Sequence, residues 1–263
     1  MADTVPEPAD IGVPSVSHAP GTRTRRLMVP DIAWVEVPAG VFIYGEGKER
    51  ETRRLDSFRM AKYPVTNAQY QCFIDDDGYA DERWWRDLKR PEPEESQWSQ
   101  ANRPRTDVDW YEAVAFCRWF SSRLGLATDA VRLPTEREWE KAARGNDGRA
   151  YPWGDEIEKA NANYYKSRDP FERPNTPGDT TPVGFYNGKA YGGFQTMNSP
   201  SPYGLYDMAG NVWQWMGDDY PKTHYRYLRG GSFMDYDYNL RSWTRNSAGP
   251  DYYSIAVGFR CAR

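Results

Sequence analysis

Residues 203–215 read YGLYDMAGNVWQW. Short apolar segments alternate here with glycine, aspartate and asparagine, and the same pattern is found from residue 150 to residue 263. Glycine and Asx residues favour turns, and in this half of the chain they interrupt the spacing of three and four apolar positions that a long helix needs. The sequence therefore excludes a helical bundle and predicts short strands joined by ordered loops.

Working outward towards the N-terminus, three short helices are predicted, each with a recognisable N-cap. Thr66 precedes an apolar pattern over residues 67–73, and Asp109 precedes one that Gly125 closes. Thr135 has Glu138 three residues later, which is the spacing of a capping box, and this helix runs to Gly145. Residues 34–45 predict two short strands around a Pro-Ala-Gly turn. Together these elements give an α+β fold with few helices.

The composition fits one large domain with an aromatic core. Of the 263 residues, 39% are apolar and 15% are aromatic, with 11 Trp and 19 Tyr. Residues 1–30 are rich in Pro, Ala, Ser and Thr, so we expect a flexible tail followed by a single domain over residues 31–263. No apolar run approaches the length of a membrane span, and no signal peptide is visible. A cytoplasmic protein without a membrane span is the expectation.

Several classes of function are excluded by residue counts. The 34 basic residues are dispersed among 38 acidic ones, which argues against a nucleic-acid partner. Two histidines and three cysteines without metal spacing cannot build a zinc or histidine-rich iron site. Oxygen donors in the loops, such as Asn163 and Asp207, suit Ca²⁺, although solvated turns explain such residues equally well.

Eight motifs then follow one another in an order typical of a known family. They read VPAGVF (37–42), YPVTNAQY (63–70), VDWYEA (108–113), RLPTEREWE (132–140), YPWG (151–154), the stretch at 203–215, RGGS (229–232) and GFRC (258–261). In these motifs the chain resembles the formylglycine-generating enzyme family, also called the sulfatase-modifying-factor family. The resemblance implies an elaborated C-type-lectin-like fold with few helices, short antiparallel strands and much ordered loop.

The family's oxidases bind copper through two cysteines that follow the RGGS motif. Here residues 233–240 read FMDYDYNL and contain no cysteine. Since thiolates are the ligands that suit Cu(I), neither copper nor sulfatase activation is expected. Iron is not expected either, because the iron-dependent relatives take their histidines from another domain. A metal-dependent oxidoreductase with non-cysteine chemistry and a fixed-partner structural subunit remain open alternatives.

The resemblance also implies two calcium sites, but only some of the residues that bind calcium in the family are retained in this sequence. The first set falls on Asp207, Gly210, Val212 and Gln214. The second falls on Asn163, Tyr164, Asp169 and Phe171. In the first set Asp207 stands where the family has an asparagine and adds a negative charge, whereas Gln214 stands where the family has a glutamate and removes one.

Cysteine-free relatives include the variable proteins of diversity-generating retroelements, whose variable patch lies between RGGS and a final Gly-Phe-Arg. In residues 233–257 only Met234 and Trp243 cannot arise from an Asn codon by replacement of adenines. The Tyr, Ser, Asn, Asp and Gly found here are also typical of binding loops. We therefore expect a non-catalytic display protein that binds a protein or other macromolecular ligand. The candidate contact residues are Asp235, Tyr236, Asp237, Tyr238, Trp243, Asn246, Tyr252 and Tyr253.

Overall fold

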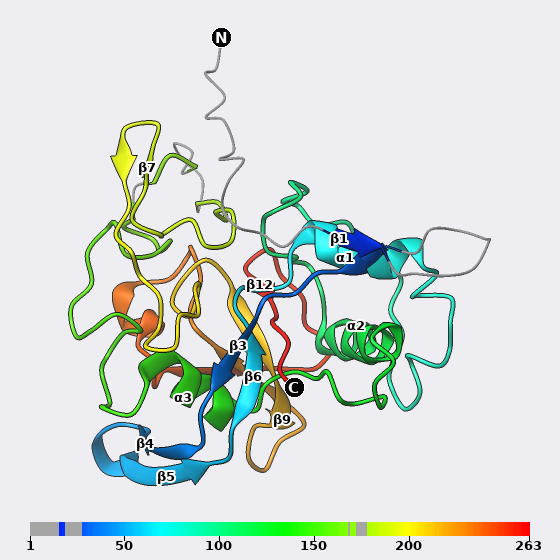
Figure 1. The fold of residues 1–263 in the computed structure, drawn as a ribbon, viewed down its shortest axis with the longest axis horizontal. Helices are drawn as coiled ribbons and strands as arrows, with labels where there is room; N and C mark the ends of the chain where they lie inside the picture. The colour runs from blue at the N-terminus through cyan, green and yellow to red at the C-terminus, as the bar shows by residue number, and fades with distance from the viewer. Residues whose placement is uncertain (1–15, 19–27, 168, 172–177) are drawn as a thin grey trace.

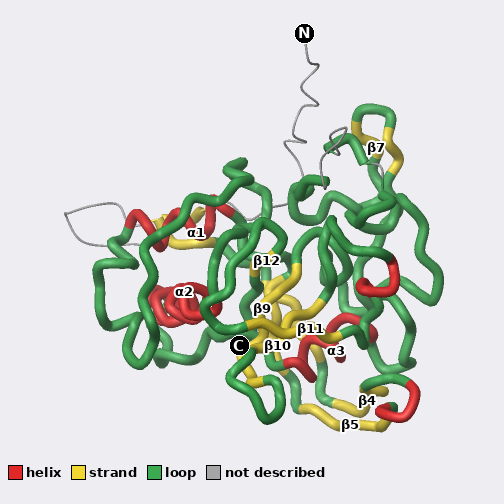
Figure 2. The backbone as a smooth tube through the Cα atoms, turned by 180° about the vertical axis from the view of Figure 1, so that it is seen from behind, coloured by secondary structure: helices red, strands yellow, loops and turns green. Residues whose placement is uncertain are grey.

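The computed structural model describes residues 16–18, 28–167, 169–171 and 178–263. Most of this chain is loop, with a few short helices and strands (Figures 1 and 2). The α+β class and the C-type-lectin-like arrangement are thus confirmed. No helix in the described part of the chain is both long and apolar enough to cross a lipid bilayer.

The three predicted helices are confirmed as α1 (Asn67–Asp75), α2 (Trp110–Arg123) and α3 (Glu136–Arg144). Each begins with a reciprocal capping box, in which the cap side chain accepts a hydrogen bond from the backbone N–H three residues on. These bonds satisfy backbone donors that a helix terminus otherwise leaves unpaired. Besides these three helices, the described chain contains two short 3-10 helices, η1 (Gly47–Glu49) and η2 (Asp237–Leu240).

The largest sheet has four strands in the order β11, β10, β9, β12. Their bounds are β9 (Trp213–Asp219), β10 (Arg226–Arg229), β11 (Arg245–Ala248) and β12 (Val257–Gly258). All pairs are antiparallel except β12 with β9. In both backbone views α1 and α2 lie to one side of β9, and α3 with β4 and β5 lies to the other (Figures 1 and 2).

The remaining strands form four two-stranded ribbons. They are β1 (Val16–His18) with β2 (Met28–Pro30), β3 (Trp34–Val37) with β6 (Phe58–Ala61), β4 (Gly40–Tyr44) with β5 (Glu51–Leu55), and β7 (Ala190–Tyr191) with β8 (Phe194–Gln195). The two strands expected within residues 34–45 exist, but each pairs with a later strand rather than with the other.

The predicted boundary of the tail at residue 30 differs from the structure. Met28–Pro30 forms β2, and Val29 is buried in the core that α1 and α2 share. An apolar Met-Val pair beside two amphipathic helices gains more from burial than from remaining in a tail. Apart from residues 16–18, the rest of the predicted tail lies outside the described residues.

Aromatic side chains fill the core, as the composition indicates. Trp119, Trp139 and Trp215 are completely buried. Cys72, Cys117 and Cys261 are buried free thiols. The core thus gives the loop-rich second half a rigid base.

Candidate functional site

The RGGS motif forms a sharp turn at the end of β10. Gly231 has a φ of +73°, and a Cβ there would lie 2.7 Å from Cδ1 of Leu240. Only glycine is compatible with this close approach and this backbone conformation. The turn places Ser232 and the residues after it opposite β11 and the loop before β12.

A pocket of about 370 Å³ opens between these segments. Trp213, Leu228 and Val257 supply apolar lining, and all three are buried. Asp235, Asn246 and Tyr252 also line the pocket. The pocket therefore joins three of the predicted contact residues from three separate segments of the chain.

Asp235 holds its loop in place through its own carboxylate. Oδ2 accepts hydrogen bonds from the backbone N–H of Ser232 at 2.9 Å and from its hydroxyl at 2.5 Å. Oδ1 accepts a bond from the Asn239 amide at 2.8 Å. Because these bonds use both oxygens, Asp235 acts on the wall of the pocket chiefly by fixing its shape.

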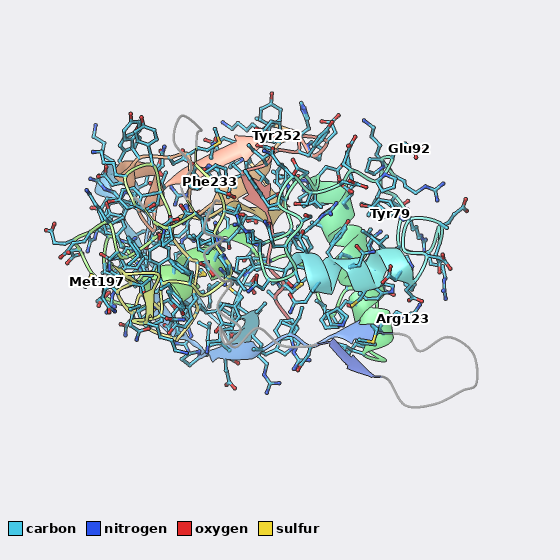
Figure 3. All side chains as sticks on the ribbon, turned by 90° about the horizontal axis from the view of Figure 1, so that it is seen from above. Tyr79, Glu92, Arg123, Met197, Phe233 and Tyr252 are labelled. Carbon is cyan, nitrogen blue, oxygen red and sulfur yellow. The ribbon has the colours of Figure 1, made fainter. Side chains whose placement is uncertain are left out.

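Exposed tyrosines are concentrated in residues 233–257, which also supply part of the pocket. Twelve large apolar side chains of the described residues are exposed, and five of them fall within residues 233–257. These five are Met234, Tyr236, Tyr238, Tyr252 and Tyr253. Figure 3 shows Tyr252 at the edge of the molecule, whereas Phe233 lies further in. Exposed aromatic side chains that form a contiguous patch are typical of interaction sites.

Two of these tyrosines extend into a stack that the sequence did not predict. The ring centroids of Tyr236 and Tyr238 are 5.9 Å apart, and those of Tyr165 and Tyr236 are 4.9 Å apart. Tyr165 is 50% exposed, and its backbone N–H donates to the Asp235 carbonyl at 2.9 Å. The only sequence signal for Tyr165 is an adjacent pair of tyrosines in a polar loop, which does not indicate a partner 71 positions later.

The other predicted contact residues are placed differently. Trp243 is half-buried, and the Arg144 guanidinium lies 5.0 Å from its ring centroid. Asp237 starts η2, and its carbonyl accepts a bond from the Tyr151 hydroxyl. Neither residue lines the pocket, so the structure separates them from Asp235, Asn246 and Tyr252.

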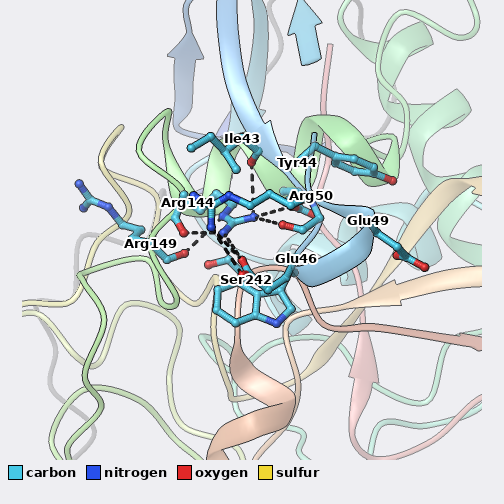
Figure 4. Close-up of polar contacts among 12 residues, drawn as sticks. Ile43, Tyr44, Glu46, Glu49, Arg50, Arg144, Arg149 and Ser242 are labelled. Carbon is cyan, nitrogen blue, oxygen red and sulfur yellow. Dashed lines mark hydrogen bonds and ion pairs between the residues drawn. The ribbon is translucent and has the colours of Figure 1, made fainter. Parts of the chain in front are cut away.

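A buried arginine anchors this region to α3. The Arg229 guanidinium donates to Glu140 Oε2 at 2.7 Å and to the carbonyls of Ser242, Trp243 and Thr244 at 2.6–3.1 Å. Glu140 Oε1 in turn accepts from Arg144 at 2.9 Å, within the polar network drawn in Figure 4. The loop over residues 242–244 thus rests on a fixed base.

A family model described as the sulfatase-modifying factor enzyme 1-like domain matches residues 18–263. The chain belongs to this family. The resemblance that the order of the motifs suggests is thereby confirmed.

Named relatives of this family include both active and inactive proteins. The formylglycine-generating enzyme of Streptomyces coelicolor is 30% identical, with 100% of this chain and 96% of that protein covered. The inactive C-alpha-formylglycine-generating enzyme 2 of Mus musculus is 29% identical over 88% of this chain and 86% of that protein. Membership of the family therefore leaves the activity open.

Solved structures confirm the fold. PvdO from Pseudomonas aeruginosa matches with a TM-score of 0.66 and 22% identity, covering 88% of this chain and 93% of that one. Treponema denticola variable protein 1 matches with a TM-score of 0.62 and 21% identity, covering 87% and 94%.

The family's cysteine chemistry has no counterpart at this pocket. Met234 and Asp235 line it in the segment where the oxidases have thiols, and no cysteine is among its described lining residues. The chain's three cysteines are buried elsewhere, with Cys117 and Cys261 packed against each other. A thiolate that binds copper or attacks a substrate is therefore not available here.

The first predicted calcium set does not fit a cation as its side chains lie. Gln214 Oε1 accepts hydrogen bonds from Trp139 Nε1 at 2.9 Å and from Arg260 Nε at 2.7 Å. Arg260 also donates to the Asp207 carbonyl at 2.9 Å. These bonds use the oxygen that Gln214 would offer to calcium, and they place a positive charge beside it.

The remaining residues of that set belong to the same turn. Burial raises the pKa of Asp207 to about 6, and its Oδ2 accepts from the Gly184 N–H at 2.6 Å. Gly210 and Val212 are buried. Calcium at this turn stays a prediction, which metal analysis of the purified protein would test.

The second predicted calcium set is likewise bonded within the protein. The Asn163 amide donates to the Asp179 carbonyl at 2.7 Å, and the Tyr164 carbonyl accepts from the Ser167 N–H. Asp169 accepts from Ser167, Tyr186 and the Phe171 N–H. Among the described residues, no group of three or more His, Cys, Asp and Glu side chains is placed to hold a metal ion.

Proposed function

We propose that this protein is a non-catalytic ligand-binding member of the family, which displays the loops of residues 233–257 to a macromolecular partner. The observation that carries this proposal is the concentration of exposed side chains in residues 233–257, namely Met234, Tyr236, Tyr238, Tyr252 and Tyr253, of which Met234 and Tyr252 line the pocket. Tyrosine supplies a large, rigid and amphipathic contact area at a small cost in side-chain entropy.

The anchoring of the loops supports the same proposal. Asp235 and Arg229 fix the backbone on either side of the exposed tyrosines, so the surface is formed before a ligand arrives. A preformed surface loses less entropy on binding than a mobile one. It also tolerates changes of the exposed side chains, because the fixing contacts come from the buried Arg229 and the half-buried Asp235. This is what a variable protein of a diversity-generating retroelement would require.

The binding surface can be tested with selected peptides. A random peptide library is selected on the immobilised wild-type protein, and the peptides obtained are measured against variants by calorimetry. Tyr236→Ala combined with Tyr252→Ala should lower the affinity for most of these peptides by at least about tenfold, since tyrosines that a ligand covers on binding are common hot spots. Tyr220→Ala combined with Tyr225→Ala removes two tyrosines that are exposed outside the loops, and it serves as the matched control.

Retained affinity in the first variant, with losses in the control, would overturn the proposed surface. Diversification is tested separately, by sequencing the 3′ end of the gene across a source population. The expected result is substitutions confined to codons 233–257, at positions that are adenine in a nearby near-copy. An invariant 3′ end without a near-copy would remove the retroelement interpretation and leave a fixed binding partner.

A further inference from the structure

A second pocket, of about 320 Å³, lies along α2 and shares no residue with the pocket of the C-terminal loops. Trp110, Val114 and Cys117 line it from one face of the helix, at spacings of four and three residues. Val131 and Leu133 line it from the segment that leads to α3. Its walls are therefore mainly apolar.

The carboxylate of Asp218, at the end of β9, also lines this pocket. Its Oδ1 accepts a hydrogen bond from the Glu136 N–H at 2.8 Å. Within the described residues no lysine or arginine forms an ion pair with Asp218. Burial, together with the charges of Glu136 and Glu138, raises the pKa of the Asp218 carboxyl.

The cations around the pocket are already used by other carboxylates. Arg132 binds Glu138 through two parallel hydrogen bonds of 2.7 Å. Arg118 lies 3.6 Å from Asp129 and donates to the Arg86 carbonyl at 2.6 Å. Asp218 is thus the carboxylate at the pocket with which no described lysine or arginine forms a direct ion pair, although Arg132 interacts with it electrostatically at longer range. An apolar slot with one such carboxylate is complementary to a small apolar molecule that carries an ammonium group.

We propose that this pocket binds small hydrophobic amines, with the apolar body between Trp110, Val114 and Leu133 and the ammonium group on the Asp218 carboxylate. The site is separate from the C-terminal loops, so it stands or falls independently of the proposed function. Its volume suits a single aromatic ring with a short chain.

Three probes of nearly equal size test the proposal: 2-phenylethylammonium, 2-phenylethanol and 3-phenylpropionate. Calorimetry on the wild-type chain should show that the amine binds about tenfold more tightly than the alcohol, with the anion weakest. Amide chemical-shift changes in NMR spectra should fall on α2 and residues 131–135. Asp218→Asn keeps an oxygen for the Glu136 N–H and should reduce the amine's affinity to that of the alcohol. Asp251→Asn, at an exposed carboxylate outside this pocket, should leave the preference intact.

Val114→Phe provides a second variant, because it fills the slot without touching Asp218. It should abolish binding of both the amine and the alcohol while the unfolding temperature shows that the protein remains folded. Equal affinity for amine and alcohol would overturn the proposal. So would an unchanged preference in Asp218→Asn, or no binding of the amine at about 10 mM, a concentration that detects even millimolar affinity.

Discussion

Arg229 shows how one side chain fixes the base of the C-terminal loops. Its guanidinium is completely buried and bonds Glu140 and three loop carbonyls. Arg229→Met keeps the volume but leaves these buried acceptors unpaired, so we expect the free energy of unfolding to fall by about 3–5 kcal/mol. Urea denaturation followed by circular dichroism would measure the loss.

Arg241→Met is the matched control, because Arg241 lies in the same loop with an exposed side chain. Its effect should stay within about 0.5 kcal/mol, as is usual for surface positions. A similarly small effect of Arg229→Met would show that Arg229 does not support the loop. The same residue explains what composition could not predict. Tyrosines in residues 233–257 are visible in the sequence, but their anchoring depends on the bond of Arg229 to Glu140, which lies 89 positions from Arg229.

At the scale of elements, the N-terminal cap of α2 makes the stability of the protein depend on pH. Asp109 caps this helix, and burial raises the pKa of its carboxyl to about 7. The folded state therefore holds a proton that the unfolded chain, with an ordinary carboxyl pKa of 3.8, has already released. Stability falls as the pH rises from about 4 to 7, and this cost is constant above pH 7.

Asp109→Asn keeps a good cap and removes the titration. The free energy of unfolding of the variant, minus that of the wild type, should increase between pH 4 and 7 by about 3 kcal/mol and then level off. Thermal unfolding at a series of pH values measures this difference. Asp109→Ser also caps without titrating, so its profile should run parallel. A difference that does not change with pH would contradict the raised pKa.

Elements differ in how well the sequence predicts them, for a physical reason. The helices are predicted correctly because cap residues and apolar period lie within a few residues of each other. Strand pairing is not local: Trp34–Val37 and Gly40–Tyr44 are adjacent in sequence, yet they pair with Phe58–Ala61 and Glu51–Leu55. In the candidate site, the contact of Tyr165 with Tyr236 and the packing of Trp243 against Arg144 also join residues far apart in the sequence, so the sequence does not predict them.

At the scale of the whole molecule, the helical first half and the loop-rich second half are joined by long-range contacts. The backbone of Cys261 accepts from the Ala61 N–H at 2.8 Å, and Ala262 exchanges hydrogen bonds with Arg132. Phe259 packs its ring against Tyr70 and Phe116. The last residues therefore complete a core that the first helices begin, and the loops between Arg229 and Phe259 are held at both ends.

Cys117 and Cys261 lie at this junction, with their sulfur atoms 3.8 Å apart. Oxidation would close a loop of 145 residues, and the entropy removed from the unfolded chain is worth up to about 5 kcal/mol. Burial raises the pKa of the Cys117 thiol well above its usual range, so thiolate is scarce and the reaction should be slow. After prolonged treatment with diamide, peptide mapping should find the Cys117–Cys261 cross-link, and the unfolding temperature should rise. Cys261→Ser should show neither change, whereas Cys72→Ser should behave like the wild type. A cross-link through Cys72, or an unfolding temperature that falls, would show that the two halves cannot be joined here without strain.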